Sequence, residues 1–325
     1  AMVSANTVKA VLVAGFAVAV AAGVESLWLL LACAFLLATV GTLFDAASFA
    51  VLPSLVPADR LAAANGRLQA GTAAIGLPGA SLAGVLFVFA AALPFAVDAV
   101  TFAAAALLLS GLPVDPSGGH PEPAVGAWRA MTDGFRWLRR ARTLFLATVI
   151  TAISNLFIGG LIAVMVLLVV NVWGTPTAAY GAVVAMATVG IVTGSLLAGR
   201  IGRRWGTVPT LPVVLAVETA ALIGLALVRH PVAGGALLAV FMGGTGVWNA
   251  LFFSYAQRVI PGRLLGRVSG VQRMAYVAVA PVGALLAGEI TARWGVPVVL
   301  MAGVVLFVVL LAASWRPLRA DRADQ

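Results

Sequence analysis

Long apolar stretches follow one another through most of this 325-residue chain, and they constrain its fold more than any other feature. A helix needs about 20 mainly apolar residues to cross the hydrocarbon core of a bilayer. Inside that core, backbone polar groups must be paired within the protein, which favours helices. Ten stretches are long enough, and their ranges are 6–24, 27–52, 67–89, 92–113, 144–170, 177–199, 207–228, 232–257, 268–290 and 296–315. We therefore predict an all-α integral membrane protein.

The composition excludes an ordinary soluble domain. Hydrophobic residues make up 62% of the chain and charged residues 10%, whereas soluble proteins carry about 25% charged residues. The net charge of +9 would suggest nucleic acid binding in a soluble protein, but membrane topology explains it better here, and we expect no nucleic acid partner. The single cysteine, Cys33, and two histidines, His120 and His230, predict neither a metal site nor a cofactor.

Basic residues collect on one side of the predicted spans. Lys9 lies at the start of the first span, and every second connection then gathers arginines, so that 18 of the 20 basic residues share one side. Only Arg229 and Arg293 fall on the other side. Cytoplasmic loops carry an excess of Lys and Arg, which predicts that both termini of this chain are cytoplasmic.

An internal repeat links two distant segments. Residues 57–84 and 261–288 are identical at nine of 28 positions, with a shift of 204 residues. Parallel repeats of this kind build many secondary transporters. The second copy starts near Leu144, and 144 − 204 lies about 60 residues before Ala1. This register predicts a first copy that lacks its first two spans.

The longest connection, 114–143, separates four predicted spans in 1–113 from six in 144–325. It opens with DPSGGHPEP and continues as a predicted helix whose apolar side chains share one face, namely Trp128, Met131, Phe135 and Leu138. We interpret it as a linker helix on the membrane surface, with a regulatory or partner-docking role as the alternative. The predicted domains are thus an N-terminal bundle, a cytoplasmic linker and a C-terminal six-span bundle with a short tail.

Three segments resemble a known transporter family. They are FDAASFAVLPSLVPADRLAAANGRLQAG (44–71), LPFAVDAVTF (93–102) and LAGRIGRRWG (197–206). They are similar to the major facilitator superfamily, in particular its twelve-span bacterial efflux branch with enterobactin-type siderophore exporters and macrolide exporters. The resemblance implies the major facilitator fold, with ten of twelve expected helices present and the first two lacking.

The resemblance also implies a cytoplasmic gating turn after the second span of each half. In the second half the motif falls on Ser195, Gly199, Arg200, Gly202, Arg203 and Arg204. Ser195 replaces the usual glycine and Gly199 the usual aspartate, so a charge relay through that carboxylate is excluded. The arginines are equally consistent with topology alone.

Antiporters of the family carry a glycine- and proline-rich motif on the fifth span. The matching residues are Gly76, Pro78, Gly79 and Gly84. Small residues let helix backbones approach closely and proline lets a helix bend, so such a helix can repack when one bundle rocks against the other. Ordinary small-residue packing is the alternative.

Three carboxylates lie inside predicted spans. A charged carboxylate there costs about 2.5–3.5 kcal/mol on insertion scales and marks an ion or substrate pathway by default. Glu218 lies midway along 207–228, Asp45 nearer the cytoplasm in 27–52, and Asp98 nearer the outside in 92–113. The alternatives are a turn anchored by Asp45, a helix end braced by Asp98, and a Glu218 paired across the bundle.

Polar side chains in the second half are candidates for lining a central cavity. They are Asn155, Asn249, Trp248 and Gln272. Hydrogen bonding between helices explains each of them nearly as well.

Together these features predict a monomeric transporter in a bacterial inner membrane, whose partners are a small-molecule substrate, protons and the lipid bilayer. The resemblance implies export of a small amphipathic molecule by proton antiport and alternating access. Uptake of a nutrient and an inactive truncated remnant are the alternatives. An intramembrane enzyme would need paired carboxylates, HExxH or a Ser/His grouping, and the predicted spans contain none.

Overall fold

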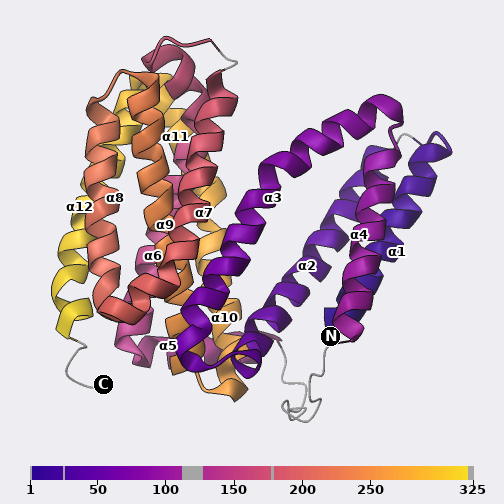
Figure 1. Ribbon diagram of the computed structural model, residues 1–325, viewed down its shortest axis with the longest axis horizontal. Helices are drawn as coiled ribbons and strands as arrows, with labels where there is room; N and C mark the ends of the chain where they lie inside the picture. Colours follow the sequence, from indigo (N-terminus) through magenta and orange to yellow (C-terminus); the bar gives the residue numbers. More distant parts are fainter. Residues whose placement is uncertain (1, 25, 112–126, 177–178, 321–325) are drawn as a thin grey trace. The chain divides into compact units, whose positions relative to one another are not determined.

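Helices form the whole of the regular structure in the part of the chain that is described (Figure 1). The computed structural model describes residues 2–24, 26–111, 127–176 and 179–320. In chain order the elements are α1 (Met2–Ala21), α2 (Leu27–Leu55), η1 (Ala58–Arg60), α3 (Leu61–Phe89), α4 (Leu93–Ser110), α5 (Ala127–Arg140), α6 (Arg142–Leu167), η3 (Leu168–Val172), α7 (Ala179–Trp205), α8 (Thr207–Leu227), α9 (Pro231–Val259), α10 (Gly262–Val277), α11 (Val279–Trp294) and α12 (Val296–Ala320).

Among the described residues, nine helical segments are long and apolar enough to cross a membrane. They coincide with nine of the ten predicted spans, and α6 with η3 forms one of them, as α10 with α11 forms another. The tenth predicted span, 67–89, lies within the 29-residue helix α3 but is not among the nine, so it stays a prediction. The predicted class, an all-α integral membrane protein, is confirmed.

The chain divides into two compact units. The first contains 1–55 and 76–125, and the second contains 56–75 and 126–325. The second unit thus includes the start of α3, which the sequence assigned to the N-terminal bundle, and the boundary falls inside that helix. Of the predicted linker 114–143, residues 127–140 form α5 in the second unit, whereas 114–126 lie outside the described residues.

Aromatic contacts hold the first unit together. The ring of Phe16 in α1 lies edge-on to Phe95 in α4, with centroids 4.8 Å apart. Phe87, near the end of α3, meets the same Phe95 ring at 5.8 Å. Edge-to-face pairs of this kind contribute about 0.5–1.5 kcal/mol beyond the area that they bury, so Phe95 joins three helices of this unit.

The second unit has a continuous apolar core between α6, α9 and α12. Phe157, Phe241 and Phe307 meet there with ring centroids 5.3–6.1 Å apart.

Small residues bring α7 and α9 close together, because a Cβ added at Gly190 or Gly194 of α7 would overlap the backbone of α9. Close backbone approach through small residues is the usual way in which membrane helices associate. Figure 1 shows these helices running alongside one another.

The sequence repeat has a local structural counterpart. Pro57 precedes η1 and Pro261 precedes α10, with φ/ψ of −58°/150° and −56°/137° respectively. The copies differ farther along, since the second is interrupted at Ala278 between α10 and α11. Proline at 281 lacks the N–H that would continue the helical hydrogen-bond pattern to residue 277, which accounts for the interruption.

Candidate functional site

Glu218 lies inside the second unit, halfway along α8. Its side chain is buried, and Oε1 accepts a 2.9 Å hydrogen bond from Oγ1 of Thr245 in α9. The space for the carboxyl comes from Gly244, where an added Cβ would lie 2.5 Å from Cγ of Glu218. No basic residue forms an ion pair with Glu218 among the described residues. The buried carboxyl thus accepts a hydrogen bond from a hydroxyl of the neighbouring helix.

In the first unit, Lys9 of α1 extends its ammonium between two aromatic rings. Its Nζ lies 4.9 Å from the ring centroid of Phe44 in α2 and 5.2 Å from that of Phe102 in α4. It also lies 3.8 Å from where a Cβ of Gly41 would stand, and Gly41 is the central residue of α2. The sequence placed Lys9 at the start of the predicted span 6–24, and its position relative to a membrane stays a prediction. Helix α1 begins at Met2, and packing brings the ammonium beside the middle of its neighbours.

The structure brings one predicted carboxylate close to this ammonium. Asp98 precedes Phe102 by one helical turn and interacts electrostatically with Lys9. It also accepts a weak 3.4 Å hydrogen bond at Oδ1 from Oγ1 of Thr101. Asp45 directly follows Phe44 on α2, and both carboxylates are exposed at the surface of the unit. Lys9 is the chain's only lysine, and this was the sequence signal for a special role.

Three of the four predicted cavity residues gather around α6. Trp248 donates from Nε1 to Oγ1 of Thr151 at 2.9 Å, and Gln272 donates from Nε2 to Oγ1 of Thr148 at 2.8 Å. Asn155 donates to the backbone oxygen of Thr151 at 2.9 Å. The bonds of Trp248 and Gln272 join α6 to α9 and α10, which is the alternative that the sequence left open, whereas the bond of Asn155 lies within α6.

The fourth predicted residue, Asn249, is partly buried on α9. A cavity-lining role stays a prediction for all four. Thr148 and Thr151 were not predicted as site residues. Their spacing with Asn155, three and then four residues, places all three on one face of a helix.

The predicted gating turn meets the start of α3 within the second unit. An added Cβ at Gly199 would lie 2.6 Å from Cβ of Ala63, and one at Gly66 would overlap the backbone oxygen of Ser195. Gly202 likewise makes room for Leu251 of α9. The motif's arginines, by contrast, are exposed, namely Arg200, Arg203 and Arg204. Its small residues make the contact between α7 and α3.

The predicted antiporter motif lies on α3. Gly76 is the first residue of the first unit after the boundary, and Pro78, Gly79 and Gly84 follow in the same helix. No atom would approach an added Cβ at Gly76 or Gly84 within 4 Å. The close helix approach expected from these two glycines is therefore not present in the structure. In the other repeat copy, Gly283 does approach the backbone of Leu156 closely.

Among the described residues, no group of three or more His, Cys, Asp or Glu side chains lies close enough together to hold a metal ion. The structure holds two separate sets of ionisable side chains on its long apolar helices. One is the Glu218–Thr245 pair, and the other is Lys9 with Asp98 and its two aromatic neighbours.

Comparison with known proteins agrees with this architecture. The model of the Major Facilitator Superfamily matches residues 7–284. No curated protein sequence matches the chain. The chain is similar to the crystal structure of a bacterial homologue of the iron transporter ferroportin in the outward-facing state, with a TM-score of 0.76 and 16% identity. The match covers 99% of this chain and 82% of the ferroportin homologue. A second such structure, with soaked iron, has a TM-score of 0.69 and 18% identity and covers 97% and 81%. At these identities the likeness shows the fold alone.

Proposed function

Because the chain belongs to the Major Facilitator Superfamily of multi-pass membrane transporters, we propose that it exports a small amphipathic molecule in exchange for protons. The proposal includes alternating access between two bundles, a monomer as the working unit and a bacterial inner membrane with both ends of this chain cytoplasmic. The major facilitator family also argues for a transporter rather than an enzyme.

The observation that carries the proposal is the buried carboxyl of Glu218. A carboxylate in the middle of a membrane helix is costly unless it is paired or used, and here Glu218 accepts a hydrogen bond from the hydroxyl of Thr245. A carboxyl in this position can take up a proton when it is open to the outside and release the proton when it is open to the cytoplasm. The proton then moves inward while the substrate moves outward.

Lys9 and Asp98 are proposed to form the second part of the pathway. A lysine ammonium between two aromatic faces is stabilised by about 1–2 kcal/mol, which is less than the cost of about 2.5–3.5 kcal/mol for a lysine at a helix centre. The cation–π contacts therefore do not offset the cost of a charged Lys9 in the membrane. We assign it to substrate or ion coupling together with Asp98.

Alternating access requires a contact that can form and break on the cytoplasmic side. The start of α3 packs on α7 through Gly66 and Gly199, and the buried Asn65 donates a 2.7 Å hydrogen bond to Gln257 of α9. We propose that this contact closes the cytoplasmic side and separates when the site opens inward. We propose that the predicted antiporter motif, which begins at Gly76 where the chain passes into the first unit, repacks during this change.

The direct test is accumulation of candidate substrates in a susceptible bacterial strain that produces the chain. The panel contains lipophilic dyes, macrolides and siderophores, and also ferrous iron because the two structural neighbours are homologues of an iron transporter. Each compound is measured with and without a protonophore. We expect lower accumulation of at least one amphipathic compound, restored by the protonophore.

Three outcomes would contradict parts of this proposal. Higher accumulation than in the empty strain, abolished by the protonophore, would show uptake instead of export. Lower accumulation that the protonophore leaves unchanged would exclude proton coupling. Unchanged accumulation throughout, with the protein confirmed in the membrane, would exclude export of these substrate classes.

A further inference from the structure

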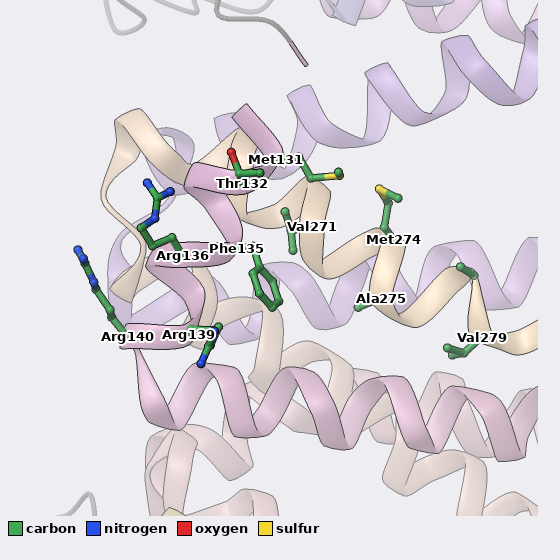
Figure 2. A pocket seen from close by; sticks show the side chains of 11 residues that line it. Met131, Thr132, Phe135, Arg136, Arg139, Arg140, Val271, Met274, Ala275 and Val279 are labelled. Atoms are coloured by element: carbon green, nitrogen blue, oxygen red, sulfur yellow. The ribbon is translucent and has the colours of Figure 1, made fainter. Parts of the chain in front are cut away.

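A cavity of about 930 Å³ lies between α5 and α10, apart from the charges assigned to transport. One wall is the amphipathic helix α5 and the other is the side of α10 that continues into the start of α11 (Figure 2). Cavities of about 300–1,000 Å³ are the usual size for small-molecule sites. The membrane-surface helix predicted from the sequence thus packs against a membrane span and leaves a pocket beside it.

Helix α5 is held against α10 at a defined point. Gly134 is buried, and a Cβ there would lie 2.7 Å from the backbone oxygen of Arg267. Leu138, one turn farther along, is 2% exposed. An ion pair of 3.9 Å between Asp133 and Arg267 adds to this contact. The wall is therefore anchored by close packing.

The interior of the cavity is apolar and open. Phe135 of α5 is 46% exposed and Met274 of α10 is 60% exposed, although both are large apolar side chains. Val271, Ala275 and Val279 continue this surface along the span. From Val271 to Val279 the helical rise of 1.5 Å per residue gives a length of about 12 Å. Such a surface suits a hydrocarbon chain that lies along the helix.

Arginines gather at the end of the cavity that lies opposite this apolar surface. In Figure 2, Arg136, Arg139 and Arg140 lie at one end of the cavity, while Met274 and Val279 lie at the other. Asp133 pairs with Arg136 at 3.3 Å. Within the described part of the chain, no carboxylate forms an ion pair with Arg139 or Arg140. Two guanidinium groups are thus available to an external anion.

We propose that this cavity binds an anionic phospholipid, with the phosphate at Arg139 and Arg140 and one acyl chain along Val271–Val279. The segment Gly262–Trp294 is one of the membrane spans, so the apolar end of the cavity lies at the depth where acyl chains are found. Basic pockets between membrane helices on the cytoplasmic side bind acidic lipid head groups. A soluble anion of the same charge would use the arginines but leave the apolar wall exposed.

The test uses the purified full chain in detergent, freed of co-purified lipid and titrated with fluorescent phosphatidylglycerol or with phosphatidylcholine of the same acyl chains. We expect preferential, saturable binding of phosphatidylglycerol. Each basic residue near a membrane surface contributes about 1 kcal/mol to the attraction of acidic lipid, so the double variant R139Q/R140Q should bind phosphatidylglycerol at least tenfold more weakly. The matched control is R60Q/R263Q, which removes two exposed arginines that do not line the cavity, and its binding should not change.

A second variant, A275F, fills the apolar part without touching a charge. This variant should bind phosphatidylglycerol more weakly. In a separate competition experiment, inorganic phosphate at millimolar concentration should fail to displace the lipid from the wild type. Equal losses in R139Q/R140Q and in the control would overturn the proposal. It would also be overturned if A275F, shown to be folded by thermal unfolding, bound normally, or if inorganic phosphate displaced the lipid. Because the readout is lipid binding, the result is independent of whether export is proton-driven.

Discussion

Nδ2 of Asn65 in α3 donates a 2.7 Å hydrogen bond to Oε1 of Gln257 in α9, across 192 residues of sequence, and both side chains are buried. The bond lies beside the place where Gly66 packs on the backbone of Ser195. It therefore joins the start of a helix that continues into the first unit to the core of the second unit.

Loss of this bond should destabilise the second unit. In Asn65→Leu the carboxamide oxygen of Gln257 loses this buried donor, and a hydrogen bond of this kind contributes about 0.5–1.5 kcal/mol to stability. We expect thermal unfolding in detergent to reveal a loss of this size. The double variant N65L/Q257L should lose less than the sum of the single variants, because paired residues are not additive. Strict additivity would show that the two side chains act independently.

A methyl group at Gly66 should separate α3 from α7. In Gly66→Ala the new Cβ would overlap the backbone oxygen of Ser195, and overpacking of this kind costs about 1–3 kcal/mol. Gly71 in the same helix is the matched control, since nothing lies within 4 Å of its added Cβ. Gly71→Ala should stabilise the protein by about 0.4–1 kcal/mol through the unfolded chain. Equal thermal stabilities of the two variants would contradict the close contact.

The single lysine provides a test that separates function from stability. Lys9→Met removes cation–π contacts of about 1–2 kcal/mol and also removes the larger cost of a charge in the membrane. We therefore expect unchanged or higher thermal stability together with at least a tenfold loss of transport. Lys9→Arg keeps the charge beside Phe44 and Phe102 and should keep most of the transport. Full transport by the methionine variant would exclude Lys9 from the pathway.

Much of the fold could be predicted from hydropathy. Runs of about 20 apolar residues predicted the spans, because the bilayer leaves few alternatives to helices. Hydropathy also placed Glu218 halfway along a span, and it lies midway along α8 in the structure. Its partner Thr245 could not be predicted, because the partner depends on how α8 and α9 are rotated against each other, and hydropathy carries no information about that rotation.

Two other differences have similar causes. The surroundings of the Lys9 ammonium could not be predicted, because apolarity does not tell which neighbouring helices a side chain meets, whereas packing places the ammonium beside Gly41. The apolar face of α5 was recognised, but its docking on α10 was not. That contact depends on Gly134, and a single glycine in an arginine-rich segment gives no signal of close packing.

The measurement that tests the central claim most directly is substrate-induced proton movement in proteoliposomes, with Glu218→Gln compared against the wild type. The control is Glu289→Gln, which makes the same chemical change at an exposed residue. Glu289 forms an ion pair with Arg293 near the C-terminal end of α11. The substrate is one found in the accumulation assay. In an imposed pH gradient, the wild type and the control should exchange protons for this substrate. The Glu218→Gln variant should fold normally and bind the substrate but show no coupled exchange. Coupled exchange by Glu218→Gln at the rate of the control would contradict the assignment of Glu218 as the coupling carboxyl.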